Sequence, residues 1–249
     1  MERLSDRIQI WKIENFATPA ECDELINSAE QIGFEKSQIE SDERISNTRT
    51  SETSYLTDKS EIGKILSKRA LDIVLNTGAR AIPETPFVGQ VQKYDKNQQY
   101  NPHYDTFDGK DGSEQRNWTL MIYLNDVVEG GGTYFPKIDL RIFPRKGMAV
   151  LWKNVNHRGC RDKLTLHTGE RVLEGRKYIA TFWFHKTPEC PRCIKSFDLN
   201  TDTDTDTDTD TDTDTDTDTV VKKNCGMVWL FILFIVLFGA VIIFLLNSE

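Results

Sequence analysis

The pattern of hydrophobic and polar residues predicts a helix early in the chain. Thr18, Pro19 and Glu21 supply an N-cap, a proline at the first helical position and the glutamate of a capping box. Gly33 can end the helix. The face expected to turn inward is apolar and consists of Leu25, Ile26, Ala29 and Ile32.

A second helix is predicted to begin at Asp58, with Glu61 three residues further on. One side of it carries mostly apolar residues, namely Ile62, Ile65, Leu66, Arg69 and Ile73.

Beyond Thr77 the pattern changes to short apolar runs separated by turn residues. These runs are strand-like and cover residues 87–94, 117–124, 132–136, 139–143, 147–152 and 177–184. No helical pattern lies between them, as a parallel sheet would require. The order of elements therefore predicts an α+β, mainly β fold, an antiparallel sandwich or barrel braced by the N-terminal helices.

The last part of the chain has a different character. Residues 227–246 carry no charge, and a helix of that length spans about 30 Å, the thickness of a bilayer's hydrocarbon core. We expect a C-terminal transmembrane helix there. A Thr-Asp repeat before it cannot bury apolar surface and predicts an extended tether. The expected domains are a globular part at 1–199, a tether at 200–226 and the anchor at 227–246.

The net charge of −8 comes from the repeat. Nine aspartates lie in residues 201–219, and the rest of the chain has 30 acidic against 31 basic residues. A near-neutral domain lacks the broad basic face that nucleic-acid binding needs, so we expect no nucleic-acid partner.

Five cysteines are too few for a disulfide scaffold. Only Cys190 and Cys193 are close in sequence. We interpret this pair as two thiols or one local bridge, with a redox pair or half a zinc site as the alternative.

Two side chains at a fixed spacing suggest metal chemistry. His103 and Asp105 share one face of an extended segment, and with a second, distant histidine they would form the two-His, one-carboxylate triad that holds non-haem Fe(II). The spacing alone is a weak signal, and taken by itself it favours a surface turn after a proline over a metal site.

Lys177 follows His167 by ten residues and lies in an apolar strand. Strand alternation puts it on one side with Ile179, Thr181 and Trp183. A buried cation needs an anionic partner, and the distal carboxylate of 2-oxoglutarate would serve. The alternative is a solvated strand residue.

Five ordered motifs resemble the prolyl 4-hydroxylase branch of the Fe(II)/2-oxoglutarate dioxygenases. The resemblance covers nearly all of residues 10–186. The motifs are IENFATPAECDELINSAEQIGFEKSQI, RTSETSYL, QVQKYDKNQQYNPHYDTFDG, TLMIYLNDVVEGGGTYFP, and GMAVLW with LHTGERVLEGRKYIATFWFH. It implies a double-stranded β-helix, or jelly roll, with a catalytic core at about 87–186.

The resemblance also implies which residues bind iron. His103, Asp105 and His167 match the family's metal ligands. His157 competes with His167, but it lies in a polar stretch, and the ten-residue spacing to a lysine favours His167. His185 follows the last strand and is expected to be structural or near the substrate.

Further positions match the family's cosubstrate pocket. Lys177 matches the partner of the distal carboxylate of 2-oxoglutarate, Tyr94 matches a tyrosine near the cosubstrate, and Tyr123 is a weaker candidate on the pocket wall. The glycine run at 130–133 matches a tight turn, which is a structural role.

Together with the predicted anchor at 227–246, the resemblance implies a membrane-anchored prolyl 4-hydroxylase. Its substrate would be proline in a peptide or a collagen-like protein, hydroxylated with Fe(II), 2-oxoglutarate and O2, releasing succinate and CO2. Ascorbate would keep the iron reduced. One alternative keeps the cofactors and changes the substrate to lysine, another side chain or a small molecule. Another is an inactive, membrane-tethered binding module.

The flanks of the predicted anchor suggest its orientation. Lys222 and Lys223 precede it, Glu249 follows it, and the N-terminus shows no apolar signal segment. Positive charge favours the cytosolic side, so we expect a cytosolic catalytic domain, with the lumen as the alternative. Large DNA viruses encode compact enzymes of this family. For a viral source the membrane would be that of the host or the virion.

Overall fold

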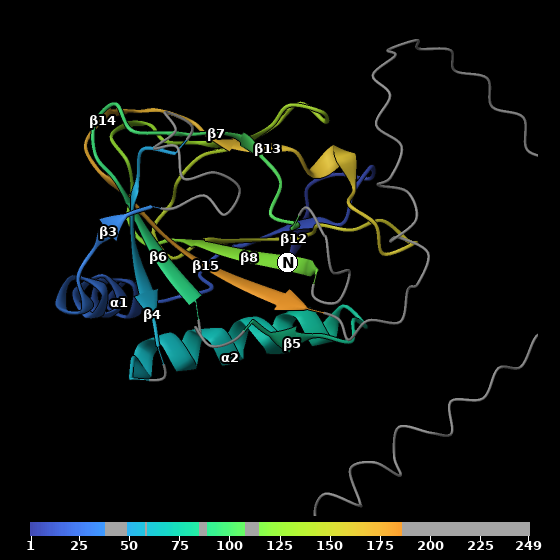
Figure 1. Cartoon of the computed structure of the whole chain (residues 1–249), viewed down its shortest axis with the longest axis horizontal. Coiled ribbons are helices and arrows are strands. Elements are labelled where there is room, and N and C mark those ends of the chain that lie inside the picture. Colours follow the sequence, from blue (N-terminus) through green and yellow to red (C-terminus); the bar gives the residue numbers. More distant parts are fainter. Residues whose placement is uncertain (38–48, 58, 85–88, 108–114, 186–249) are drawn as a thin grey trace, which may run out of the picture. The chain divides into compact units, whose positions relative to one another are not determined.

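The computed structural model describes residues 1–37, 49–57, 59–84, 89–107 and 115–185 (Figure 1). The chain divides into a unit at 1–200 and a second at 201–249. The predicted tether, the predicted membrane helix and the Cys190–Cys193 pair all lie outside the described residues. Within the described ranges, no helix has the length and apolar character needed to cross a bilayer.

The first predicted helix is confirmed as α1 (Pro19–Ile32). The capping box forms as expected, because Glu21 N donates to Thr18 Oγ1 at 3.2 Å and Thr18 N donates to the Glu21 carboxylate at 2.8 Å. Gly33 ends the helix at φ 99°. The predicted apolar face is too wide by one residue, since Ile32 in the last turn is exposed.

The second helix, α2 (Glu61–Asn76), begins later than predicted. Asp58 lies outside the described residues, and the N-cap is Ser60, whose hydroxyl accepts from Gly63 N at 3.2 Å. Glu61 is therefore the first helical residue and does not close a capping box. Ile62 and Leu66 face the core as expected, whereas Ile65 is exposed.

The strands form a nine-stranded main sheet within the described residues, in the order β1-β2-β12-β8-β15-β6-β4-β3 with β5 against β15. All of its pairings are antiparallel. The members are β1 (Glu2–Arg3), β2 (Ile10–Ile13), β3 (Glu35–Lys36), β4 (Glu52–Leu56), β5 (Ile82–Pro83), β6 (Gly89–Tyr94), β8 (Arg116–Tyr123), β12 (Ala149–Lys153) and β15 (Lys177–His185).

A second, four-stranded sheet has the order β11-β10-β13-β7. It contains β7 (Tyr100–His103), β10 (Thr133–Phe135), β11 (Leu140–Ile142) and β13 (His167–Gly169). A short pair joins β9 (Glu129–Gly130) to β14 (Val172–Glu174), and a single 3-10 turn, η1 (Lys163–Thr165), precedes β13. Figure 1 shows β7 and β13 on one side of the main sheet and the two helices on the other.

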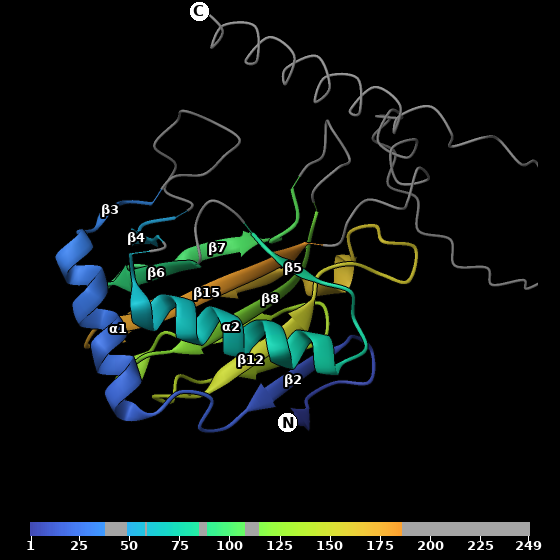
Figure 2. The same ribbon diagram turned by 90° about the horizontal axis from the view of Figure 1, so that it is seen from below.

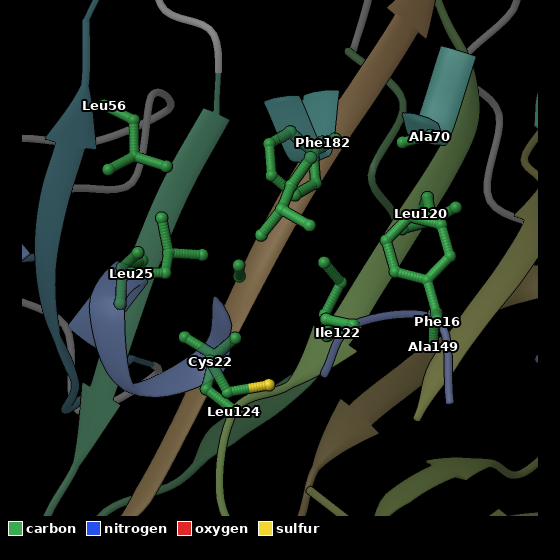
Figure 3. Close-up of a cluster of buried hydrophobic side chains, with 14 of the residues drawn as sticks. Phe16, Cys22, Leu25, Leu56, Ala70, Leu120, Ile122, Leu124, Ala149 and Phe182 are labelled. Atoms are coloured by element: carbon green, nitrogen blue, oxygen red, sulfur yellow. The ribbon is translucent and has the colours of Figure 1, made fainter. Parts of the chain in front are cut away.

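Alternation along the main strands builds two cores, one on each face of the main sheet. Leu120 and Ile122 of β8 point toward α1 and α2, which cover that face in Figure 2, and the packed cluster appears in Figure 3. Met121 and Tyr123 of the same strand point the other way and pack with Phe135 of β10. The interior between the two sheets is therefore lined by one alternate set of side chains.

The mainly β prediction is confirmed, with two facing sheets as in a jelly roll. All six predicted strands appear where the structure describes them, with ends shifted by one or two residues. Residues 87 and 88, at the start of the first predicted strand, lie outside the described part.

Candidate metal and cosubstrate site

Three predicted residues meet between the sheets although they come from distant parts of the chain. His103 ends β7, His167 begins β13, and these two residues are direct partners across the antiparallel ladder. Asp105 follows β7, and its Oδ1 lies 3.7 Å from His103 Nε2 and 3.7 Å from His167 Nε2. One ligand atom from each of the three lies within 4.8 Å of the others, a spacing that can hold one metal ion.

Backbone carbonyls fix the tautomer of both histidines. His103 Nδ1 lies 2.8 Å from the carbonyl oxygen of Asn101, and His167 Nδ1 lies 2.9 Å from that of Thr165. A carbonyl can only accept, so each Nδ1 carries the hydrogen. In the neutral form of each ring, Nε2 then carries a lone pair facing the other two residues, which is the form that binds a metal.

The electrostatic environment favours the metal-binding protonation states. Burial, then the nearby His167 imidazole, lowers the pKa of His103 to about 3, so this ring is neutral at pH 7. Burial alone would raise the pKa of Asp105, but the imidazoles of His167 and His103 outweigh it and hold the pKa below its usual value. Neutral imidazole and ionised carboxylate are the forms that coordinate metals.

Aromatic rings enclose the two histidines. Tyr100 stacks on His103 with ring centroids 3.5 Å apart. Phe135 and Trp152 lie 5.3 Å and 5.1 Å from the His167 ring. This apolar wall excludes water from one side of the site and limits the rotation of both imidazoles.

Lys177 lies in the same interior, at the start of β15. Its side chain is 1% exposed, and its Nζ lies 5.3 Å from the ring centroid of Tyr94 and 5.6 Å from that of Tyr123. Among the residues that the structure describes, this ammonium has no hydrogen-bond or ion-pair partner. Burial lowers the pKa of Lys177 to about 7, against the opposing charge of Glu170.

A cation held in this way fits an anionic ligand. Burying an ammonium without a counter-ion is costly, and a carboxylate entering beside Nζ would remove that cost. The donor set of His103, Asp105 and His167 fits Fe(II), and Lys177 fits the distal carboxylate of a dicarboxylic acid. Both sets of groups face the space between the sheets.

Comparisons with known proteins agree with this chemistry. Residues 89–185 match the model of the 2OG-Fe(II) oxygenase superfamily. The chain is 32% identical over 210 residues to "Probable prolyl 4-hydroxylase 6" of Arabidopsis thaliana, covering 74% of this chain and 71% of that protein. The chain belongs to the prolyl 4-hydroxylase family.

Two further relatives support this membership. "Probable prolyl 4-hydroxylase 9" of Arabidopsis thaliana is 32% identical over 206 residues, covering 72% of this chain and 69% of that protein. The viral collagen prolyl hydroxylase of Paramecium Bursaria Chlorella virus-1, solved as a 2OG complex, superimposes with a TM-score of 0.62 at 30% identity. That match covers 72% of this chain and 96% of the viral one.

Membership of the prolyl 4-hydroxylase family fixes the reaction type and the cofactors. The chain is a dioxygenase of the procollagen-proline 4-dioxygenase type. Its metal is Fe(II) and its cosubstrates are 2-oxoglutarate and O2, with ascorbate as the reductant typical of prolyl hydroxylases.

The other histidines lie outside the triad. His157 is exposed in a turn beyond β12. His185 is buried at the end of β15, where its ring nitrogens lie 3.1 Å from the Gln115 carbonyl and 3.1 Å from the Glu84 carboxylate. Arg116 pairs with the same Glu84 carboxylate at 2.6 Å. His185 therefore belongs to a charged cluster next to the site.

The remaining predicted positions have mixed roles. Tyr123 is completely buried, and its hydroxyl donates to Thr133 Oγ1 at 2.7 Å, so this tyrosine forms pocket wall through its ring. The glycine run makes a tight turn, in which Gly130 has φ 79° and a Cβ would lie 2.3 Å from the Arg171 carbonyl oxygen. That turn admits only glycine at this position.

Sequence reasoning missed the residues that contact Asp105. Its Oδ2 accepts from Thr119 Oγ1 at 2.6 Å and from Trp183 Nε1 at 3.2 Å. One prediction could have indicated Trp183, because it puts Trp183 on the same face of β15 as Lys177 and therefore toward the site. Nothing in the sequence distinguished Thr119 from other buried strand threonines.

Proposed function

We propose that this chain hydroxylates carbon 4 of proline in a peptide. The observation that supports the proposal most strongly is a His-Asp-His cluster in the same interior as a buried lysine, in a member of the prolyl 4-hydroxylase family. This lysine has no ion-pair partner among the residues that the structure describes. When bound, Fe(II) supplies O2 activation coupled to the oxidative decarboxylation of 2-oxoglutarate to succinate and CO2.

Different residues of the chain would bind the metal, bind the cosubstrate and exclude water. His103, Asp105 and His167 hold the metal on one side and leave the opposite positions open. Lys177 binds and orients 2-oxoglutarate through a charge-assisted contact to its distal carboxylate. Tyr94 and Tyr123 flank that contact and exclude water from it, which strengthens it. Ascorbate would return oxidised iron to Fe(II).

The substrate proposal is a proline-containing or collagen-like peptide. It draws on the names of the similar proteins, which are prolyl 4-hydroxylases and a viral collagen prolyl hydroxylase. A lysyl or small-molecule substrate, and an inactive binding module, are the alternatives that an assay must separate.

Peptide-dependent release of succinate tests the proposal. The full chain is assayed with Fe(II), 2-oxoglutarate and ascorbate, and with a proline-rich peptide, its proline-to-alanine counterpart or a lysine-rich peptide. We expect release above the peptide-free rate only with the proline-rich peptide. Stimulation by the lysine peptide alone would establish the second enzyme class, and no release with any peptide would favour a binding module.

We also propose that residues 227–246 anchor the enzyme in a membrane, with the catalytic domain in the cytosol. The uncharged run and the flanking Lys222 and Lys223 support this. Protease treatment of intact microsomes tests on which side of the membrane the catalytic domain lies. Complete digestion of the domain without detergent supports the cytosolic location, and protection of the domain contradicts it.

A further inference from the structure

The two oxygens of Asp105 have different surroundings. Oδ1 faces the Nε2 atoms of both triad histidines at 3.7 Å. Oδ2 points away from them and accepts two hydrogen bonds, from Thr119 Oγ1 and Trp183 Nε1. The carboxylate is thus held with one oxygen engaged by the protein and one oxygen available.

A third residue completes the hydrogen bonding of the Thr119 hydroxyl. Asn154 Nδ2 donates to Thr119 Oγ1 at 2.8 Å. An ionised carboxylate can only accept, so the single hydroxyl hydrogen of Thr119 goes to Asp105, and the amide nitrogen of Asn154 donates to the hydroxyl oxygen. In the opposite orientation of the amide, Asn154 Oδ1 would lie beside the hydroxyl and compete with Asp105 Oδ2 for its hydrogen.

Burial and backbone contacts keep this arrangement in place. Thr119 is completely buried and Asn154 is 1% exposed. Thr119 lies on β8, and Asn154 follows β12, the strand paired with β8. The backbone of Asn154 is held at both ends, since its N–H donates to the Asn117 carbonyl at 2.8 Å and its carbonyl accepts from Asp162 N at 2.9 Å.

The orientation of Asn154 carries an energetic cost. Its Oδ1 is buried and has no hydrogen-bond partner among the described residues. Leaving a buried acceptor without a hydrogen bond destabilises the folded protein. The amide nonetheless directs its nitrogen toward Thr119, as expected if the oriented hydroxyl is the function of this residue.

We propose that Asn154 and Thr119 form a positioning relay that holds Asp105 in a one-oxygen orientation toward the metal. Thr119 and Trp183 donate to Oδ2, and Asn154 keeps the Thr119 hydroxyl directed at that oxygen, so Oδ1 is the oxygen presented to the ion. One-oxygen binding keeps the remaining metal positions open. This inference rests on the proposed role of Asp105 as a ligand.

Binding of Mn(II) to the metal-free full chain, without 2-oxoglutarate, tests the relay. Free Mn(II) is measured by electron paramagnetic resonance. We expect Thr119→Val to raise the dissociation constant by about 10–100-fold, the usual effect of losing a hydrogen bond to a ligand. Thr119→Ser, which keeps the hydroxyl, should restore affinity near that of the unmodified chain.

Asn154 supplies a second, independent measurement. Asn154→Ala should weaken Mn(II) binding, and it should have little further effect in the Thr119→Val background, because it acts only through that hydroxyl. If Thr119→Val does not fold, the Mn(II) affinity of Asn154→Ala alone tests the relay. The relay would be overturned if the effects of the two substitutions on Mn(II) affinity were fully additive. It would also be overturned if a folded Thr119→Val or Asn154→Ala protein bound Mn(II) as tightly as the unmodified chain.

Two controls separate the causes of failure. Ser54→Ala removes a buried hydroxyl that donates to the Ala29 carbonyl, far from the site, and should leave Mn(II) affinity unchanged. Asp105→Ala should abolish tight Mn(II) binding. Retention of binding by Asp105→Ala would contradict the ligand assignment itself, whereas loss there with unchanged binding in Thr119→Val contradicts only the relay.

Discussion

Lys177 and Tyr94 are direct partners across β15 and β6, and the lysine Nζ lies 5.3 Å from the tyrosine ring. The pairing places a buried amine against an aromatic face, with no carboxylate partner in the described residues. Such a site favours a neutral lysine until an anion arrives, because burial penalises the charged form. Binding of 2-oxoglutarate and protonation of Lys177 should therefore be coupled.

Calorimetry of 2-oxoglutarate binding can measure this coupling. The pKa of Lys177 is about 7 without the ligand and should rise when the distal carboxylate pairs with Nζ. Mn(II)-loaded enzyme should take up about half a proton per ligand at pH 7 and nearly one at pH 9. Titrations in buffers of different ionisation enthalpy give this number. Lys177→Ala should bind 2-oxoglutarate more weakly, and its binding should no longer be accompanied by proton uptake.

The same shift affects the stability of the unliganded protein. Between pH 7 and about 10.5 the unfolded chain holds a proton on Lys177 that the folded chain has released. Stability from this group should therefore rise with pH across that window. In the calorimetric experiment, an unchanged proton uptake on binding of 2-oxoglutarate to Lys177→Ala would show that a group other than Lys177 titrates.

Substitution of the triad tests which histidine completes the metal site. His103→Ala and His167→Ala should each lose iron and activity, because each removes one of three protein ligands. His157→Ala should keep both, since His157 is exposed and outside the cluster. Iron content of purified protein, measured by metal analysis, checks this. Loss of iron in His157→Ala with retention in His167→Ala would reverse the assignment.

The link between α1 and α2 should contribute pH-dependent stability. Arg69 of α2 donates to both carboxylate oxygens of Glu21, at 3.0 Å and 2.7 Å, and this contact lowers the pKa of Glu21 to about 2. Glu21→Gln should lower the free energy of unfolding by about 1 kcal/mol at pH 7, a value reduced for partial exposure.

The sign of the pH effect follows from the lowered pKa. The contribution of Glu21 is complete above about pH 4.5 and disappears as the pH falls toward 2, so the difference between the two proteins should shrink there. Glu24→Gln, an exposed position on the same helix, should change stability by less than about 0.5 kcal/mol at any of these pH values. A constant difference down to pH 2 would rule out the ion pair as the cause.

Two glycines with similar backbone angles should differ sharply in their tolerance of alanine. Gly147 has φ 81° and a Cβ there would lie 2.3 Å from the Ala17 carbonyl oxygen, whereas Gly78 has φ 83° and open space. Gly78→Ala should cost about 1–2 kcal/mol for the backbone angle alone. Gly147→Ala should cost about 1–3 kcal/mol more because of the clash. Urea unfolding of the two variants measures the difference, and equal values would contradict it.

Local signals predicted the parts of the fold that depend on local chemistry. The capping box at Thr18 and the alternation along β15 are confirmed because neighbouring residues alone determine them. The predicted start of α2 was too early, because Asp58 and Ser60 are both residue types that cap helices and the sequence pattern does not distinguish between them. Sequence could not show that Asn154 lies beside Thr119, since only the pairing of β12 with β8 brings them together.

The product formed on a peptide tests the central claim most directly. The purified full chain is incubated with Fe(II), 2-oxoglutarate, ascorbate and a proline-rich peptide, and the peptide is sequenced by tandem mass spectrometry with amino-acid analysis. The account predicts 4-hydroxyproline at specific positions in the unmodified chain and none with His103→Ala. Hydroxylation of another residue type, or succinate release with an unmodified peptide, would contradict it.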